Sequence, residues 1–175
     1  MNLFKIMTIL ALLSPLAFSG CSKAQEEGQH GDVKYAPKVN CVNNLKQIGF
    51  AFKMWARDHD EKFPFQLSTN SAGTLELISP DRDGFDSNAF LYLKTMQGDE
   101  GLATPLLLVC PQDKSKKAAA SLSNLQPENV TYRFTASPNN GLSGPRILAV
   151  CPIDGNILYD DGTVHDKSGN SVSTP

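Results

Sequence analysis

Four cysteines, at positions 21, 41, 110 and 151, are the side chains with the most distinctive chemistry in this 175-residue sequence. No two of them form a Cys-x-x-Cys pair, the spacing typical of thiol–disulfide oxidoreductases. If Cys21 has a separate use, the other three permit three different single disulfide bridges, each leaving one thiol over. Cys110 with Cys151 is one option, because "LLLVCPQD" and "ILAVCPID" end alike. A Cys41–Cys151 bridge, or no bridge at all, also stays open.

Cys21 ends a segment that is typical of an exported protein. "MNLFKIMTILALLSPLAFSGC" has a basic residue at Lys5 and an apolar stretch from Ile6 to Phe18. The stretch is too short for a membrane-spanning helix, which needs roughly 20 apolar residues, and it fits a secretory signal peptide over residues 1–20. "FSGC" resembles a bacterial lipobox. The sequence therefore predicts a lipoprotein with palmitate on Cys21, anchored in the bacterial cell envelope at the periplasmic face or in the outer membrane.

The segment "DRDGFDSN" carries three carboxylates, Asp81, Asp83 and Asp86, around a glycine. Oxygen ligands of this kind suit Ca²⁺, but the spacing departs from an EF-hand loop and the final bidentate Glu is missing. A plain acidic turn, with Asn88 capping the next helix, is the alternative. Asp154, Asp160 and Asp161 are expected to form turns. Beyond this possible Ca²⁺ no cofactor is expected.

The sequence gives little support for an enzyme or for a nucleic-acid-binding protein. His30, His59 and His165 are not at metal-ligand spacing. The sequence has no nucleophile elbow, phosphate loop or dinucleotide fingerprint. The formal net charge of −2 provides no basic surface for nucleic acid. We expect a protein that is not an enzyme.

The stretch "CVNNLKQIGFAFKMWARDH" predicts an amphipathic helix that begins near Pro37 or Asn40. Its apolar stripe consists of Cys41, Leu45, Ile48, Phe52 and Trp55, widened by Phe50 and Met54. A membrane-surface helix would need a strongly cationic polar face, and a cofactor slot would need more polar ligands than His59. Packing on the protein's own sheet needs neither, so the stripe is predicted to be core.

The rest of the chain predicts an α+β domain, residues 38–165, between a flexible tether (21–37) and a disordered tail (166–175). The region from Ser115 to Glu128 is expected to be a loop. Asp154-Gly155 and Asp161-Gly162 are hairpin turn signals. A second helix is predicted in "NAFLYLKTMQG", with Phe90, Leu93 and Met96 or Gln97 inward. Strands are expected at Gly73–Ser79, Pro105–Pro111, Asn129–Ser137, Arg146–Pro152 and Asn156–Val164.

Three motifs resemble the prepilin-type, type II secretion pseudopilin-like proteins of Planctomycetes and Verrucomicrobia. They are a Cys-x-Asn-Asn-Leu-Lys-Gln-Ile-Gly segment from Cys41 ahead of Phe63-Pro64, a Cys-Pro-x-Asp at Cys110, and a C-terminal His-x9-Asp-Gly signature. In the last, Asp161-Gly162 match and Cys151 replaces the histidine. The resemblance covers residues 38 to about 165.

The resemblance implies a pilin-like fold, with a long N-terminal amphipathic helix packed on an antiparallel sheet and no catalytic residues. Because the first two cysteines are the ones the family retains, it favours a Cys41–Cys110 bridge. The family's prepilin cleavage site and membrane helix are absent, and a lipid on Cys21 takes their place. The expected role is a non-catalytic, lipid-anchored structural or assembly protein of a type II secretion or pilus-like system. The alternative is an envelope-surface binding module for polysaccharide, peptide or calcium.

Overall fold

A computed structural model describes residues 35–98, 101–136 and 145–172, with side chains from Asn40 onward. The chain divides into two units, Met1–His30 and Gly31–Pro175, and every described residue belongs to the second. The signal peptide, Cys21, His30 and most of the predicted tether lie outside the described residues. Within the described part of the chain, no helix combines the length and the apolar character needed to cross a bilayer.

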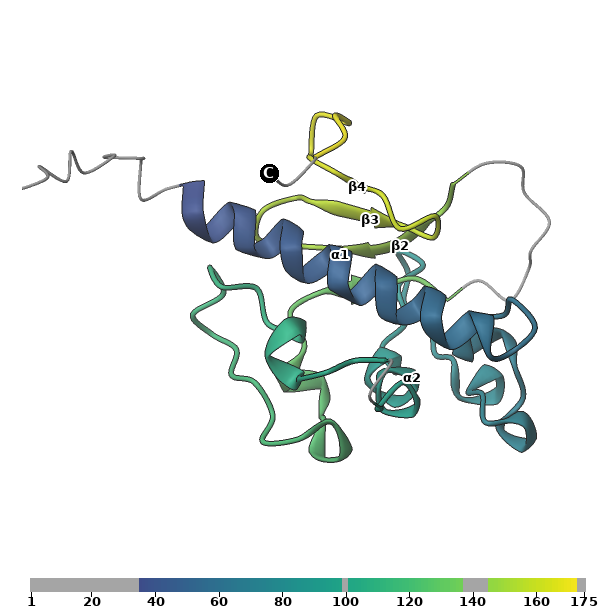
Figure 1. The fold of residues 1–175 in the computed structure, drawn as a ribbon. Helices are drawn as coiled ribbons and strands as arrows, with labels where there is room; N and C mark the ends of the chain where they lie inside the picture. The colour runs from purple at the N-terminus through teal and green to yellow at the C-terminus, as the bar shows by residue number, and fades with distance from the viewer. Residues whose placement is uncertain (1–34, 99–100, 137–144, 173–175) are drawn as a thin grey trace, which may run out of the picture. The chain divides into compact units, whose positions relative to one another are not determined.

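The first helix, α1, runs from Tyr35 to Arg57 (Figure 1). It begins inside the segment predicted as tether and ahead of the predicted starts. Pro37 is compatible with this position because the first N–H groups of a helix have no intrahelical acceptor. The helix ends where Asp60 and Glu61 take positive φ angles of 55° and 58°.

Four short strands form one antiparallel sheet in the order β1-β2-β3-β4. Glycines at the two predicted hairpin turns take the positive φ that these turns require, 73° at Gly155 and 86° at Gly162. The prediction of an α+β fold with an antiparallel sheet is confirmed. The strands are β1 Arg133–Phe134, β2 Ile147–Val150, β3 Ile157–Tyr159 and β4 Val164–His165.

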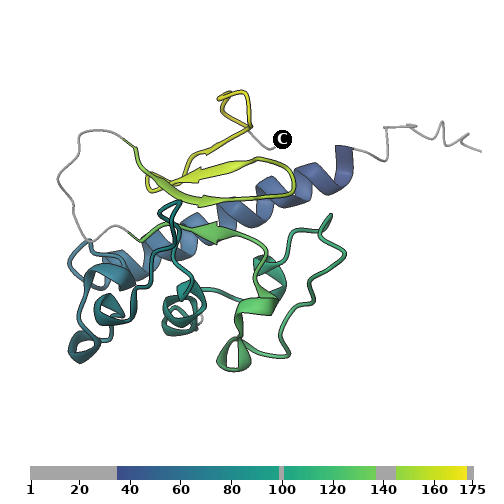
Figure 2. The ribbon, with the colours of Figure 1, turned by 180° about the vertical axis from the view of Figure 1, so that it is seen from behind.

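The strands β3 and β4 and the 3₁₀ helix Pro105–Leu108 pack against α1. Figures 1 and 2 show α1 running between the sheet on one side and α2 (Ala89–Thr95) with the short 3₁₀ turns on the other. The helix and sheet approach closely at Gly49, where an added Cβ would lie 2.8 Å from Cδ1 of Leu158.

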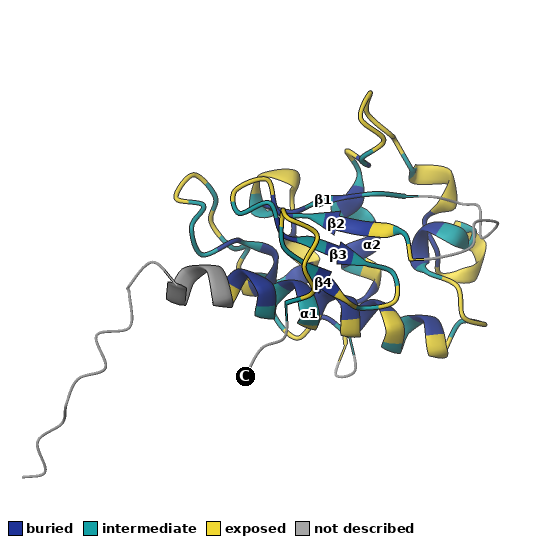
Figure 3. Cartoon of the chain, turned by 90° about the horizontal axis from the view of Figure 1, so that it is seen from above, coloured by how far each residue is buried: buried dark blue, intermediate teal, exposed yellow. Residues whose placement is uncertain are grey.

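The core joins α1, α2 and the sheet through apolar side chains (Figure 3). Leu45, Ile48 and Phe52 are fully buried, and Trp55 is partly buried against them. Phe50, expected to widen the stripe, instead has 62 % of its surface exposed. Phe50 is two residues from both Ile48 and Phe52, so helical spacing places it on the face opposite the buried stripe. Phe52 packs in an aromatic cluster, with edge-to-face or tilted ring contacts to Phe63, Phe65, Tyr92 and Phe134.

Two predicted strands are 3₁₀ turns instead. Gly73–Ser79 contains the turn Leu75–Leu77, and Pro105–Pro111 contains Pro105–Leu108. In the second segment Pro105 supplies a helical φ at the first position, and the Thr104 hydroxyl accepts a hydrogen bond from the Leu106 amide. Apolar composition alone had suggested strands. The local capping chemistry favours a turn.

The C-terminal segment from Asp166 to Val172, predicted as disordered, folds back on β4. The Val172 amide donates to the Val164 carbonyl over 2.8 Å. The Asp166 carboxylate accepts hydrogen bonds from the amides of Ser168 and Asn170. An Asp-centred turn of this kind needs no apolar residues, which is why hydropathy did not indicate it.

The second helix lies where it was expected, and the prediction that Leu93 and Met96 face inward is confirmed. Its inward residues are Ala89, Tyr92, Leu93 and Met96, whereas Phe90 is half-buried and Gln97 is exposed. Asn88 stands at the N-cap position, but its side chain makes no capping hydrogen bond; its Nδ2 donates to the Leu77 carbonyl.

Candidate functional site: a buried thiol cluster

Three distant segments bring Cys41, Cys110 and Cys151 together. Cys41 lies on α1, Cys110 follows the 3₁₀ helix Pro105–Leu108, and Cys151 follows β2 directly. All three side chains are fully buried. Their sulfur atoms and one carboxylate oxygen of Asp154 all lie within 4.8 Å of one another. Among the described residues this is the one group of three or more metal-ligand side chains so placed.

The turn that begins at Cys151 places Asp154 beside the sulfur atoms. The Gly155 amide donates to the Cys151 carbonyl over 2.9 Å, and the Asp154 amide lies 3.4 Å from Cys151 Sγ, to which it donates. The Asp154 carboxylate is then 3.4 Å from Cys110 Sγ. The sequence indicated Asp154 only as a turn former, so its position among the thiols was missed. The repeated Cys-Pro-x-Asp pattern was the available signal.

The turn at Cys110 begins in the same way but directs its aspartate elsewhere. The Asp113 amide donates to the Cys110 carbonyl over 2.9 Å. The Asp113 carboxylate accepts the Thr131 hydroxyl at 2.8 Å, and the same Thr131 oxygen accepts the buried Cys110 amide at 3.2 Å. Asp113 therefore positions Cys110 through Thr131.

Polar side chains also surround Cys41. The Tyr132 hydroxyl lies 3.9 Å from Cys41 Sγ and donates to it. Asn156 is fully buried, and neither its amide nitrogen nor its amide oxygen has a hydrogen-bond partner. Its side chain is near enough to Cys41 to favour the thiolate, though not in hydrogen-bond geometry. Asn44, one turn along α1, donates to the Val109 carbonyl at 3.2 Å and so ties the helix to the Cys110 turn.

The thiols are not electrostatically equivalent. The pKa of Cys151 is lowered, chiefly because the Cys41 side chain hydrogen-bonds to it, while burial opposes this effect. The same contact and burial hold the pKa of Cys41 far above its ordinary value. Desolvation raises the pKa of Cys110.

Two kinds of chemistry are open to this cluster. The three cysteines are free thiols in the structure, and because all three meet, each of the disulfide pairs considered from the sequence is brought into one place. Three sulfur donors with a carboxylate also make a ligand set for a thiophilic metal. A bridge uses two sulfurs, whereas a metal uses all four donors.

The predicted calcium ligands are not assembled in this way. Arg133 contacts Asp81 at 2.7 Å and Asp83 at 3.1 Å. One oxygen of Asp86 accepts hydrogen bonds from the amides of Ser79 and Asn88. One guanidinium already pairs with two of these carboxylates, and the third organises its own loop, so the arrangement is that of an acidic turn.

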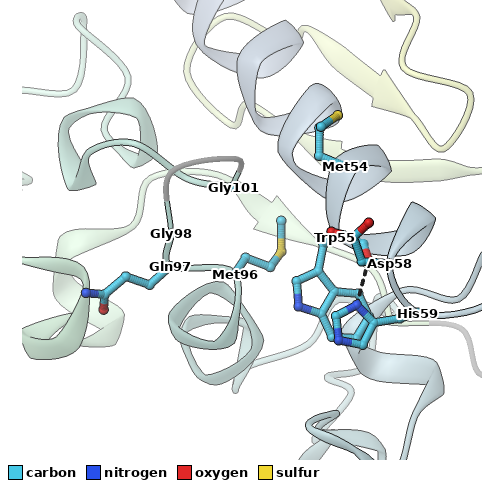
Figure 4. Close-up of a pocket in the computed structure, with 8 residues that line it drawn as sticks. All are labelled: Met54, Trp55, Asp58, His59, Met96, Gln97, Gly98 and Gly101. Atoms are coloured by element: carbon cyan, nitrogen blue, oxygen red, sulfur yellow. Dashed lines mark hydrogen bonds between the residues drawn. The ribbon is translucent and has the colours of Figure 1, made fainter.

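His59 lies in a pocket of about 390 Å³ at the end of α1 (Figure 4). Its ring stacks on Trp55 with centroids 3.5 Å apart, and its Nδ1 lies 2.7 Å from the Trp55 carbonyl oxygen. In Figure 4 the Gln97 side chain points away from these rings. His165, the other described histidine, lies on β4 and contacts the Gly169 carbonyl. The two histidines do not converge on a ligand.

No family model, curated protein or solved structure matches this chain. Its role must therefore be inferred from its residues and their geometry.

Proposed function

We propose that the chain is a non-catalytic, lipid-anchored structural protein of the bacterial envelope, with a pseudopilin-like domain that serves a type II secretion or pilus-like assembly. The observation that carries the proposal is that the apolar stripe of α1 is buried inside the domain. Leu45, Ile48 and Phe52 are completely buried. A long first helix covered by an antiparallel sheet is the arrangement that the pseudopilin-like motifs imply.

The buried stripe also bears on how the protein would hold a membrane. A helix lying on a bilayer must present its apolar face to lipid, and the apolar face of α1 contacts β3 and β4 instead. The proposed lipid on Cys21 would then provide the attachment, with the segment before Tyr35 as the connection to the domain.

The non-catalytic role draws support from what the charged side chains do. Asp86 and Asp113 hold loops through hydrogen bonds to backbone and hydroxyl groups. The Arg146 guanidinium lies 2.9 Å from the Asp160 carboxylate and joins β2 to the β3–β4 turn. These contacts give all four residues a structural role.

The anchor is tested by labelling cells that express the full chain with a palmitate analogue. We expect the wild type and Ser22→Ala to carry the label and to sediment with membranes, while Cys21→Ser loses both properties. Label that persists in Cys21→Ser would contradict the proposed lipidation. The matched Ser22→Ala variant controls for changes in signal processing.

The assembly role is tested separately by cross-linking intact cells and recovering the tagged full chain from detergent extracts. Recovery of secretion or pilus subunits, reduced in the unanchored Cys21→Ser variant, is the expected result. A correctly anchored protein that cross-links to none of them would refute the assembly role and leave the lipid anchor standing.

A further inference from the structure

We propose that Cys41, Cys110, Cys151 and Asp154 form a closed, structural zinc site. The four donor atoms come from α1, from the turn after Pro105–Leu108 and from the turn after β2, yet they lie within 4.8 Å of one another. The three cysteines are fully buried. A shared ligand would therefore connect the beginning, the middle and the end of the domain at a single point.

The spacing of the donors is close to that of a tetrahedral centre. Zinc–sulfur bonds of about 2.3 Å and zinc–oxygen bonds of about 2.0 Å give tetrahedral edges of roughly 3.8 Å between sulfurs and roughly 3.5 Å between sulfur and oxygen. The distance from Cys110 Sγ to the nearer Asp154 oxygen is already 3.4 Å. Closing the widest separation requires the donors to move by about 1 Å, which side-chain rotation supplies.

The types of donor select the metal. Three thiolates and one carboxylate in a tetrahedral set suit Zn²⁺, whereas Ca²⁺ and Mg²⁺ require shells of oxygen ligands. Catalytic zinc sites keep one position open for water, and structural sites have four protein ligands. Here the protein provides four donors, and its sulfurs are shielded from solvent.

The surroundings fit a negatively charged metal–thiolate centre. Thiolate ligands are stabilised by hydrogen-bond donors in the outer shell. The Asp154 amide donates to Cys151 Sγ and the Tyr132 hydroxyl to Cys41 Sγ. Asn156 is a fully buried amide beside Cys41 with no hydrogen-bond partner. A buried amide without a partner is costly, and donation to a metal-bound Cys41 thiolate would satisfy its nitrogen.

A disulfide accounts for less of the geometry. A bridge through Cys110 would remove the S–H group that now faces the Asp154 carboxylate at 3.4 Å. That carboxylate would then face an oxidised sulfur with nothing to donate. A bridge between Cys41 and Cys151 would keep the hydrogen bond from Cys110 to Asp154 but would use only two of the four clustered donors.

The proposal is tested on the full chain, purified without chelators. We expect one zinc per chain by elemental analysis. Refolding with Co²⁺ should give the d–d absorption of a tetrahedral ion and a thiolate-to-metal charge-transfer band. Asp154→Asn should weaken zinc binding at least tenfold in competition with a chromophoric chelator. Asp161→Asn, the same change in the β3–β4 turn, where the carboxylate accepts hydrogen bonds from the Thr163 amide and hydroxyl, should leave zinc affinity unchanged.

Other results would overturn the proposal. They are a native disulfide among the three cysteines found by mass spectrometry, Co²⁺ spectra without a sulfur band, or equal zinc affinity in wild type and Asp154→Asn. Because Cys→Ser variants risk misfolding, the decisive comparison uses the two Asp→Asn variants, whose far-ultraviolet circular dichroism verifies folding. None of these readouts depends on the anchor or on an assembly partner.

Discussion

Asp113 and Asp154 occupy the same place in two Cys-Pro-x-Asp turns, yet only Asp154 directs its carboxylate at the thiols. Asp113 accepts the Thr131 hydroxyl at 2.8 Å, while Asp154 lies 3.4 Å from Cys110 Sγ. In each turn the cysteine carbonyl accepts a hydrogen bond from a backbone amide, that of Asp113 in one and that of Gly155 in the other. The two aspartate carboxylates differ in what they contact. One supports the cluster from outside and the other belongs to it.

Thr131 is the residue through which the outer support acts. In Thr131→Val the buried Cys110 amide loses its acceptor, and a buried donor without a partner costs about 1–3 kcal/mol. We expect the free energy of unfolding in urea, followed by Trp55 fluorescence, to fall by that amount. Thr95→Val is the control, because the Thr95 hydroxyl bonds only to a carbonyl of its own helix. Equal losses in both variants would contradict this role.

Phe50 and Phe52 are two residues apart on α1 and have opposite environments. Phe52 is fully buried within the aromatic cluster, and Phe50 is 62 % exposed. Phe52→Ala should lower the free energy of unfolding by about 3–5 kcal/mol, whereas Phe50→Ala should change it by less than about 0.5 kcal/mol. Denaturant titration of the pair measures both. A large loss in Phe50→Ala would mean that the exposed face of α1 is covered.

Gly49 sets the distance between α1 and the sheet. An added methyl group would meet Leu158 Cδ1 at 2.8 Å and the Gly162 Cα at 3.5 Å. Overpacking of this kind costs about 1–3 kcal/mol, offset in part by the roughly 1 kcal/mol that alanine gains over glycine in a helix. We expect Gly49→Ala to be net destabilising in thermal unfolding. Combined with Leu158→Ala it should cost less than the sum of the single changes. Strict additivity would show that the contact is not tight.

The lowered pKa of Asp81 predicts the direction in which the stability of the protein changes in acid. Arg133 hydrogen-bonds to its carboxylate and, with the Phe85 and Asp83 amides, lowers the pKa of Asp81 below its ordinary 3.8. The stabilisation is therefore complete above that ordinary value and is lost as the pH falls through the lower, folded pKa. Between about pH 5 and about pH 2.5, the melting temperature of Arg133→Met should fall by less than that of the wild type. Asp113 and Asp161, whose pKa values are also lowered, titrate in both proteins and cancel. Parallel pH profiles would contradict the assignment.

The features that could be predicted from sequence are those that depend on local spacing. Leu45, Ile48 and Phe52 recur at helical intervals, and Gly155 and Gly162 supply the turn conformation that a hairpin needs. The same spacing places Phe50 about 200° around the helix from Ile48 and Phe52, so the prediction that it widens the stripe was wrong.

Long-range features were out of reach. The apolar run after Thr104 forms a 3₁₀ helix because its first-turn proline and its Thr104 cap decide the local structure. Asp154 acquires its environment from Cys41 and Cys110, which lie far away in the chain. The local sequence Cys-Pro-Ile-Asp-Gly predicts only a turn, and the structure has a turn there.

The order of elements along the chain has a consequence for synthesis. The ribosome delivers α1 early, whereas β3 and β4, which cover it, come close to the C-terminus. Throughout most of translation, the apolar side of the nascent helix has no native surface to pack against. A prematurely terminated product lacking the last strands would keep that side bare, so a holding chaperone or a quality-control protease would recognise it through Leu45, Ile48 and Phe52.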